Sequence, residues 1–268
     1  MFNQVTIIGV GLIGGSLGMG VRARGLARTV MGVGRDESRL RQGVDGGALD
    51  YFTTDLGTGV TGADLVIIAV PVGMIVTMLQ KALPYLKPGA IVTDVGSCKA
   101  AIVKAVEAIM PPDVHFVGGH PMAGSEQVGI GAANRYLFEG AYYIFTPTSH
   151  TDQEALRQVS TLARNLGCRV LEMDPQDHDR AVAAVSHLPH LLASTLVNTV
   201  GRIPGSEQAL LLAAGGYRDT TRVAAGSPEM WRDILLTNRE MVRAMINEFR
   251  TELDTIERTL AEGDPDQI

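Results

Sequence analysis

Residues 5–18 read VTIIGVGLIGGSLG, and this stretch decides the fold of the first part of the chain. The apolar residues up to Gly9 predict a strand, and a helical pattern starts directly after it. Gly9, Gly11 and Gly14 form a G-x-G-x-x-G spacing at this junction. The first glycine permits a tight turn, the second lets the backbone approach a pyrophosphate, and the third lets helix and strand pack closely.

A pyrophosphate would then lie over the helix N-terminus, where unpaired N–H groups and the helix dipole favour an anion. The alternative is a glycine-rich turn that only packs, which fits poorly because three glycines in six positions are conformationally costly. The stretch therefore predicts a dinucleotide-binding domain of the Rossmann type. The residues expected to contact the cofactor are Gly9, Gly11, Leu12, Ile13, Gly14, Arg35, Val70 and Pro71.

The end of the second predicted strand bears on which dinucleotide binds. An acidic residue about 20 positions after the glycines normally receives the ribose hydroxyls. Here that position is Gly34, followed by Arg35 and Asp36. A glycine removes the carboxylate that would repel a 2′-phosphate, and Arg35 would hold that phosphate, so NADP is favoured over NAD. Two alternatives stay open: Asp36 serves NAD from a shifted loop, or both charges are simply solvated.

Short β-branched runs alternate with helical patterns up to about residue 173, which predicts a doubly wound, mostly parallel α/β sheet. The predicted strands cover 5–9, 30–34, 65–70, 90–94, 114–117, 141–146 and 169–173. The predicted helices of this part cover 12–25, 38–44, 100–109 and 152–166. Residues 1–173 are therefore assigned to the dinucleotide-binding domain.

Residues 174–268 are predicted to form an all-helical domain. A pattern over 177–200 contains Pro189, where a kink or break is expected. Further helices are predicted over 206–214 and 228–261. The last is too long for one small domain to bury, so we expect association of two subunits.

Residues 118–126, GGHPMAGSE, follow the fifth predicted strand and place His120 where open α/β sheets bind ligands. Oxidising a hydroxyl needs a base for its proton as well as a hydride acceptor, so His120 is the candidate proton acceptor. Ser97 ends the neighbouring strand segment. It is expected to cap the next helix, to hydrogen-bond His120, or to do both.

Two other segments carry candidate binding residues. Residues 215–222, GGYRDTTR, are predicted to join two helices, and their arginines suit a substrate carboxylate, with an ion pair to Asp219 as the alternative. His187 and His190 are three residues apart, but no third ligand presents itself, so no metal site is predicted. His178, between two aspartates near a helix start, is interpreted as structural.

Composition limits the remaining function classes. The chain of 268 residues is 46% apolar with a formal net charge of −6, which argues against nucleic acid as a partner. Its two cysteines, Cys98 and Cys168, lack metal-type spacing and suit a reducing compartment. No run approaches the about 20 apolar residues that a membrane-spanning helix needs. We therefore expect a soluble cytoplasmic protein.

Seven ordered motifs resemble the prephenate/arogenate dehydrogenase family of tyrosine biosynthesis. They are GVGLIGGSL, TDVGSCK, GGHPMAGSE, IFTPT, DHDRAVAAVSHLPH, GGYRDTTRVA and PEMWRDI, and together they span nearly the whole chain. The resemblance implies a Rossmann domain followed by a helical dimerisation domain in a homodimer. It also implies an oxidative decarboxylation with NAD or NADP, in which ring C4 of prephenate or arogenate gives up a hydride and the C1 carboxylate leaves as CO2.

The resemblance also implies roles for single residues. His120 accepts the proton of the C4 hydroxyl, Ser97 supports it, and Arg222 binds a substrate carboxylate. The residues implied around the substrate side chain are His190, Ser125, Glu126 and Trp231. Glu126 would favour the ammonium of arogenate over the keto group of prephenate, but the substrate preference stays open.

The sequence leaves two alternatives to a prephenate/arogenate dehydrogenase. A β-hydroxyacid dehydrogenase-like enzyme shares the domain order but typically uses a catalytic lysine on the long helix after the first domain, and residues 174–200 contain no lysine. A dinucleotide-sensing module without turnover would have no use for His120, Ser97 and Arg222 together.

Overall fold

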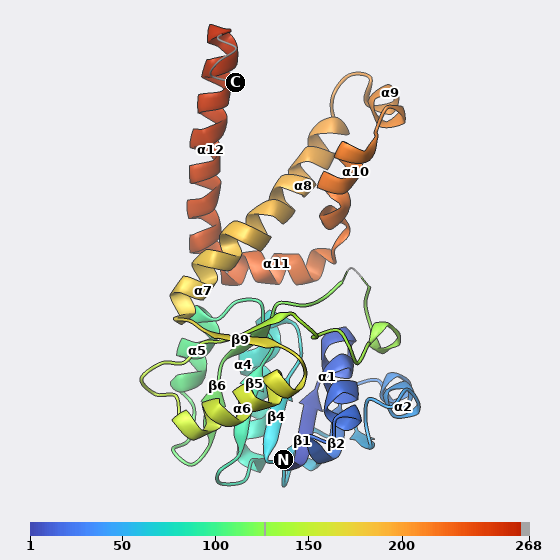
Figure 1. Ribbon diagram of the computed structural model, residues 1–268, viewed down its shortest axis with the longest axis vertical. Helices are drawn as coiled ribbons and strands as arrows, with labels where there is room; N and C mark the ends of the chain where they lie inside the picture. Colours follow the sequence, from blue (N-terminus) through green and yellow to red (C-terminus); the bar gives the residue numbers. More distant parts are fainter. Residues whose placement is uncertain (126, 264–268) are drawn as a thin grey trace. The chain divides into compact units, whose positions relative to one another are not determined.

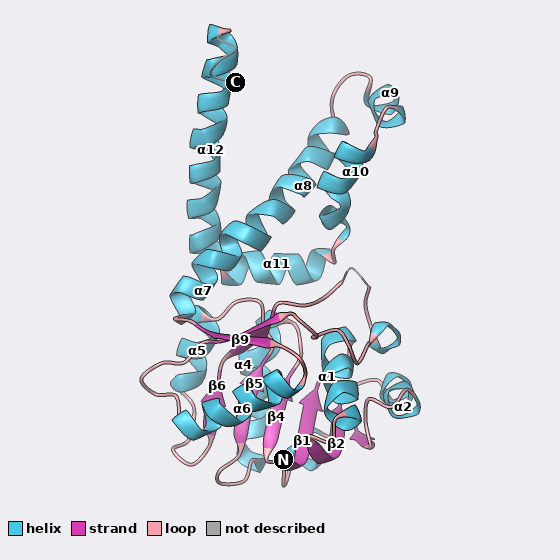
Figure 2. Cartoon of the chain, viewed as in Figure 1, coloured by secondary structure: helices cyan, strands magenta, loops and turns pink. Residues whose placement is uncertain are grey.

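The computed structural model describes residues 1–125 and 127–263. The chain divides into two compact units, Met1–His178 and Asp179–Ile268 (Figure 1). Strands occur only in the first unit, and the described part of the second unit is helical (Figure 2). No helix among the described residues is both long and apolar enough to cross a membrane.

The first unit is built on a six-stranded parallel sheet with the order β3-β2-β1-β4-β5-β6. This order is that of doubly wound dinucleotide-binding folds, so the predicted fold class is confirmed. The strands of the sheet are β1 (Phe2–Ile8), β2 (Ala27–Val33), β3 (Tyr51–Thr53), β4 (Leu65–Ile68), β5 (Ile91–Asp94) and β6 (His115–Val117). The central strand β4 is buried throughout, as expected for a sheet with helices on both faces.

Helices connect these strands and cover the sheet. They are α1 (Leu12–Ala23), α2 (Glu37–Asp45), α3 (Leu56–Val60), α4 (Ile75–Ala82) and α5 (Ala100–Glu107), with α6 (Gln153–Asn165) later in the chain. Apolar residues of α1 and α6 join those of β1 in one buried cluster, for example Leu17, Leu162 and Ile7. Because the strands are parallel, the carboxyl ends of β1, β4, β5 and β6 lie along one edge of the sheet.

A second sheet of three strands follows, with the order β7-β8-β9. Its strands are β7 (Gly119–Pro121), β8 (Tyr142–Phe145) and β9 (Arg169–Glu172). β7 runs antiparallel to β8 and starts one residue after β6, so the chain leaves the first sheet at Gly118. β3 and β7 are not among the strands predicted from the sequence. β8 and β9 are, but the sequence pattern did not indicate that they form a sheet of their own.

The described part of the second unit consists of helices that range from 6 to 24 residues. After α7 (Pro175–Val182), a π-helical turn (Ala183–His187) leads into α8 (Leu188–Val200), followed by α9 (Ser206–Leu211), α10 (Gly215–Thr221), α11 (Pro228–Thr237) and α12 (Arg239–Glu262). The sequence predicts a kink or break at Pro189; the π-helical turn ends two residues before it, and Pro189 itself lies in the first turn of α8.

Two predictions about the second unit are wrong. The segment 215–222 is not a loop, because α10 occupies most of it and a 3-10 turn continues from Arg222. The single helix predicted over 228–261 is two helices that meet at Asn238. The Asn238 amide donates a 2.7 Å hydrogen bond to Asp179 O and lies 3.2 Å from His187 Nδ1, so tertiary contacts hold the break.

Candidate active site

The glycine loop lies at the carboxyl end of β1 and opens helix α1. Gly9 has φ +95°, and a Cβ there would lie 2.4 Å from Ala69 O, so only glycine fits this turn. Gly11 is the N-cap of α1, with no side-chain cap. A Cβ on Gly11 would meet nothing within 4 Å, so the backbone is open to a ligand on this side. The residues here fit a pyrophosphate bound at the helix N-terminus.

The remaining residues predicted to contact the cofactor lie near the same edge. Leu12 and Ile13 form the half-buried first turn of α1. A Cβ on Gly9 would come within 3.0 Å of Val70 Cγ1, which places Val70 beside the glycine loop. Pro71 follows it and is exposed.

The two charged residues in the loop after β2, Arg35 and Asp36, differ in their contacts. Asp36 is the N-cap of α2: its Oδ1 accepts a 3.2 Å hydrogen bond from Arg39 N, and its Oδ2 lies 3.3 Å from Arg39 Nε. Arg35 is exposed, and Gly34 is packed near Leu40. The aspartate that was the alternative ribose ligand is therefore occupied in capping a helix.

His120 lies on β7, and its side chain is buried, with 9% of the residue exposed. Its Nδ1 is 2.9 Å from Nε2 of His178, and the two rings meet edge to face. His178 is 0% exposed. The interpretation of His178 as a merely structural residue missed this contact, because the partners are 58 positions apart. One nitrogen of the His120 ring is thereby engaged, which sets the orientation of the ring.

Ser97 lies half-buried in the turn between β5 and α5. It does not cap that helix, because the N-cap is Lys99. No hydrogen bond joins Ser97 to His120, although the structure describes both residues. The two loops are connected through other residues: the buried Asp94 and Lys99 both bond to the backbone of Gly119, next to His120. Sequence reasoning missed this pair because a lysine ordinarily signals an exposed position.

Ser125 lies in the segment after β7. It is exposed, and its hydroxyl accepts a 3.2 Å hydrogen bond from Gln127 N. The predicted substrate residue Glu126 lies outside the described residues.

The second unit brings together three other predicted substrate residues. The rings of His190 and Trp231 stack at 3.6 Å between centroids and 5° between planes. His190 Nδ1 is 2.9 Å from the carbonyl oxygen of Val223, the residue after the exposed Arg222. Burial lowers the pKa of His190 below its usual 6.5, although the Val223 carbonyl opposes that shift. His190 is therefore favoured in its neutral form.

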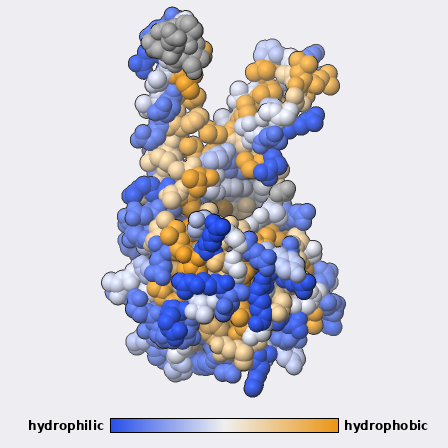
Figure 3. All heavy atoms as spheres, in the orientation of Figure 1, coloured by the Kyte–Doolittle hydropathy of each residue, from blue (hydrophilic) through white to orange (hydrophobic). Residues whose placement is uncertain are grey.

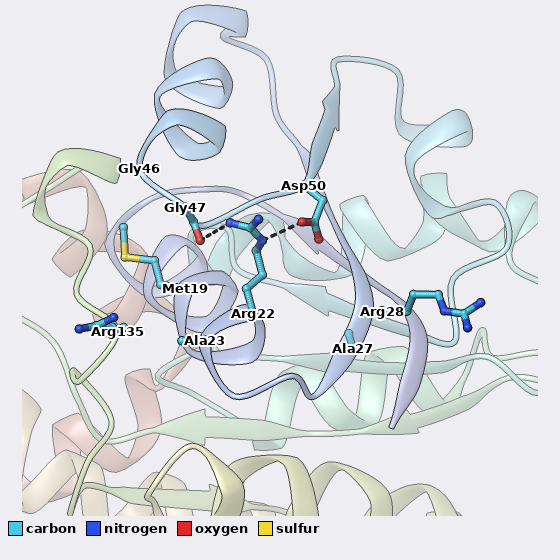
Figure 4. A pocket seen from close by; sticks show the side chains of 9 residues that line it. All are labelled: Met19, Arg22, Ala23, Ala27, Arg28, Gly46, Gly47, Asp50 and Arg135. Carbon is cyan, nitrogen blue, oxygen red and sulfur yellow. Dashed lines mark hydrogen bonds and ion pairs between the residues drawn. The ribbon is translucent and has the colours of Figure 1, made fainter.

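A separate cavity of about 460 Å³ lies at the opposite end of the first sheet (Figure 4). Its central side chain, Arg22, donates to Gly47 O at 2.7 Å and to Asp50 Oδ1 at 2.8 Å. Asp50 also accepts from Val30 N. These bonds tie the last turn of α1 and the middle of β2 to the loop after α2. The glycine loop and His120 do not line this cavity, so it is not the candidate active site.

The doubly wound sheet, the glycine loop and the buried histidine at its edge define a dinucleotide-binding oxidoreductase. Comparison with known families gives two matches. The family model described as prephenate dehydrogenase, nucleotide-binding domain, matches residues 17–172, and the model of its dimerization domain matches residues 174–268. The chain belongs to the prephenate dehydrogenase family.

Individual relatives agree over nearly the full chain. Prephenate dehydrogenase of Bacillus subtilis is 35% identical over 100% of this chain and 73% of its own length. The crystal structure of the Aquifex aeolicus prephenate dehydrogenase in complex with hydroxyphenyl propionate and NAD+ matches with a TM-score of 0.92 and 34% identity, over 98% of this chain and 92% of that one. Synechocystis arogenate dehydrogenase matches with a TM-score of 0.84 and 33% identity, over 97% and 92%.

Proposed function

We propose that this protein catalyses the NAD(P)-dependent oxidative decarboxylation of prephenate, arogenate or both, giving 4-hydroxyphenylpyruvate or tyrosine. The observation that carries the proposal is the buried His120 on β7, just beyond the carboxyl end of β6 and held at Nδ1 by His178. Support comes from the family membership and from relatives named for both substrates.

The chemistry assigns one task to each part of the site. A nicotinamide dinucleotide held at the glycine loop would supply the acceptor for the hydride of ring C4. His120 takes the proton of the C4 hydroxyl at Nε2, because its Nδ1 is engaged by His178. The bond from C1 to the carboxylate then breaks and CO2 leaves. The electron pair of that bond makes the ring aromatic and leaves the C4 oxygen as a phenolate. The proton returns to the phenolic oxygen, so none is consumed.

The other predicted residues are proposed to bind substrate. Arg222 pairs with a carboxylate through its planar guanidinium. Ser97, which makes no direct hydrogen bond to His120, supports the hydrogen-bond network of the C4 hydroxyl when substrate is bound. Neutral His190, stacked on Trp231, presents a polar edge and an apolar face to the substrate side chain. Ser125 and Glu126 are proposed to contact the same side chain.

For the cofactor, we propose that NADP is accepted through Gly34 and Arg35. Asp36 is engaged as a helix cap and by Arg39, so it is a poor ligand for ribose hydroxyls. Arg35 is exposed at the strand end, where a 2′-phosphate would be expected. Buried thiols at Cys98 and Cys168 suit the reducing cytoplasm that we propose as the location.

We further propose a homodimer formed by the second unit. The apolar residues buried there are few and mostly small: Val182, Ala183, Ala193, Ile234 and Val242. Many larger ones stay exposed, including Val197, Leu210, Leu211, Leu212, Leu236, Leu253, Ile256 and Leu260. Figure 3 shows apolar residues gathered at the α9 end. A second copy would bury this surface. Light scattering is expected to give twice the chain mass, and a monomer would contradict the proposal.

The test of the catalytic assignment is His120→Asn, with His115→Asn as the matched control. Loss of a general base costs about 10²–10⁴-fold in rate, so His120→Asn should lose kcat by that factor. Its cofactor Kd should stay within about twofold of wild type, because the glycine loop is untouched. His115, half-buried on β6, should tolerate the change. Full activity in His120→Asn would remove His120 from the chemistry.

A further inference from the structure

The carboxyl end of β5 holds a buried ion pair that the chemistry described above does not use. The side chains of Asp94 and Lys99 are both 0% exposed, and the Lys99 ammonium contacts Asp94 Oδ2 directly. Removing two charges from water is costly unless both are paired and further hydrogen-bonded. Three further hydrogen bonds of the pair involve backbone groups of Gly96 and Gly119.

Both backbone groups of Gly119 are held by this pair. Gly119 N donates to Asp94 Oδ1 at 3.2 Å, and Lys99 Nζ donates to Gly119 O at 2.8 Å. That carbonyl belongs to the peptide bond between Gly119 and His120. The pair therefore fixes the chain on the side of β7 that faces away from β8.

β7 needs such support because it is short and lies at the edge of its sheet. It has three residues and pairs only with β8, where His120 lies opposite Ile144. An edge strand of this length has little intrinsic stability. The Asp94–Lys99 pair makes the hydrogen bonds to Gly119, the residue before His120, that a second neighbouring strand would otherwise make.

The same pair also closes the turn that carries Ser97. Asp94 begins this turn and Lys99 ends it, and Gly96 N donates to Asp94 Oδ2 at 2.9 Å. Two residues assigned to the site, Ser97 and His120, are thus attached to one buried ion pair. No hydrogen bond joins them directly.

We infer that Lys99, held by Asp94, is a positioning residue that sets where His120 meets the substrate. The inference rests on the proposed function, because it assumes that His120 takes the proton. Lys99 acts through the Gly119 carbonyl and is not itself a proton donor to substrate. An error of about 1 Å in a catalytic group can cost about 10²-fold in rate, which gives this contact its importance.

The first unit contains a matched control for the experiment. Lys87 Nζ donates to Gly62 O at 3.0 Å and contacts Asp64 Oδ1, so it also bonds one aspartate and one glycine carbonyl. This pair lies at the amino ends of β4 and β5, away from His120, and Lys87 is 39% exposed.

The experiment compares Lys99→Met with Lys87→Met in the full-length protein. Lys99→Met should lower kcat about 10- to 100-fold. Its cofactor Kd should stay within twofold, and KM should change less than kcat. The imidazole ¹⁵N shifts of His120 and His178 should also move, which a uniform loss of stability would not cause. Lys87→Met should keep kcat and the imidazole shifts.

Lys99→Met leaves the Asp94 charge buried and alone, which is strongly destabilising. Two further variants cover the case in which it does not fold. The double variant Asp94→Asn/Lys99→Met removes both charges. Gly119→Ala leaves the pair intact but pushes on the same peptide, since its Cβ would lie 2.9 Å from Asp94 O and 3.0 Å from Thr93 Oγ1. Both should show the same loss of kcat at nearly unchanged cofactor affinity.

A folded Lys99→Met or double variant with wild-type kcat would overturn the inference. That result is distinguishable from failure of the proposed function, which would appear as full activity in His120→Asn. Inactive His120→Asn together with fully active Lys99→Met would overturn the inference alone.

Discussion

The glycine loop offers a pair of substitutions that separates folding from cofactor binding. An alanine Cβ at Gly14 would lie 2.1 Å from the carbonyl oxygen of Gly9, whereas ordinary contact begins at 3.4 Å. The same Cβ would lie 3.0 Å from Ile7 Cγ2. α1 would have to move about 1 Å away from β1, and overpacking of this kind costs about 1–3 kcal/mol. For a chain of this size, that lowers Tm by about 2–10 °C.

Gly11→Ala is the matched change in the same loop. Its Cβ would meet no atom within 4 Å, and φ −101° is accessible to alanine. Alanine is a poorer N-cap than glycine by up to about 1 kcal/mol, so Tm should fall by no more than about 4 °C. The methyl group would instead occupy the space proposed for the pyrophosphate. Losing one or two hydrogen bonds to a charged group weakens binding by about 1.5–3 kcal/mol, or about 10- to 100-fold.

The assay is thermal unfolding without cofactor, followed by calorimetric titration with NAD and with NADP. Gly14→Ala should lose both stability and affinity, and Gly11→Ala should lose mainly affinity. Wild-type affinity in a folded Gly11→Ala would refute the placement of the pyrophosphate over the N-terminus of α1.

Three further predictions concern single residues. Arg222→Ala should raise KM and lower kcat/KM by about 2–3 kcal/mol, the scale of a lost charged hydrogen bond, and unchanged steady-state kinetics would remove Arg222 from the site. Arg35→Ala should weaken NADP about 10-fold or more while changing the Kd of NAD less than about twofold, and equal effects on both in titrations would contradict the 2′-phosphate assignment. Burial holds the pKa of His190 below the unfolded value of 6.5, so its neutral form contributes stability above pH 6.5 that is lost as pH falls through the folded pKa. His190→Gln should therefore flatten the loss of Tm on acidification, and an identical pH dependence would show that another group causes it.

Local sequence patterns were sufficient for five of the six strands of the first sheet, all except β3. Residues 5–18 carry a strand, a glycine turn and a helix in order, and the later apolar runs repeat the strand signal, so the parallel sheet follows. β7 gives no such signal, because its residues, Gly119, His120 and Pro121, do not favour strands. It forms through contacts with distant residues, chiefly its pairing with β8, about 20 residues later.

The parts of the candidate site that sequence reasoning missed depend on contacts between distant positions. His178 meets His120 across 58 residues, and Lys99 meets Gly119 across 20. A histidine at position 178 and a lysine at position 99 do not by themselves indicate a buried side chain, although both are buried. Asn238 likewise ends α11 through contacts with Asp179 and His187, while the apolar spacing around it continues without a break. Contacts between distant residues therefore determined these features, which the spacing of apolar residues along the chain does not indicate.

The central claim is tested most directly by measuring kcat/KM for prephenate and for arogenate, each with NAD and with NADP, from the absorbance of the reduced nicotinamide. The account predicts turnover of at least one substrate with release of CO2, and a higher kcat/KM with NADP than with NAD. Absence of reduction in all four combinations, from a folded protein that binds the dinucleotide, would contradict it.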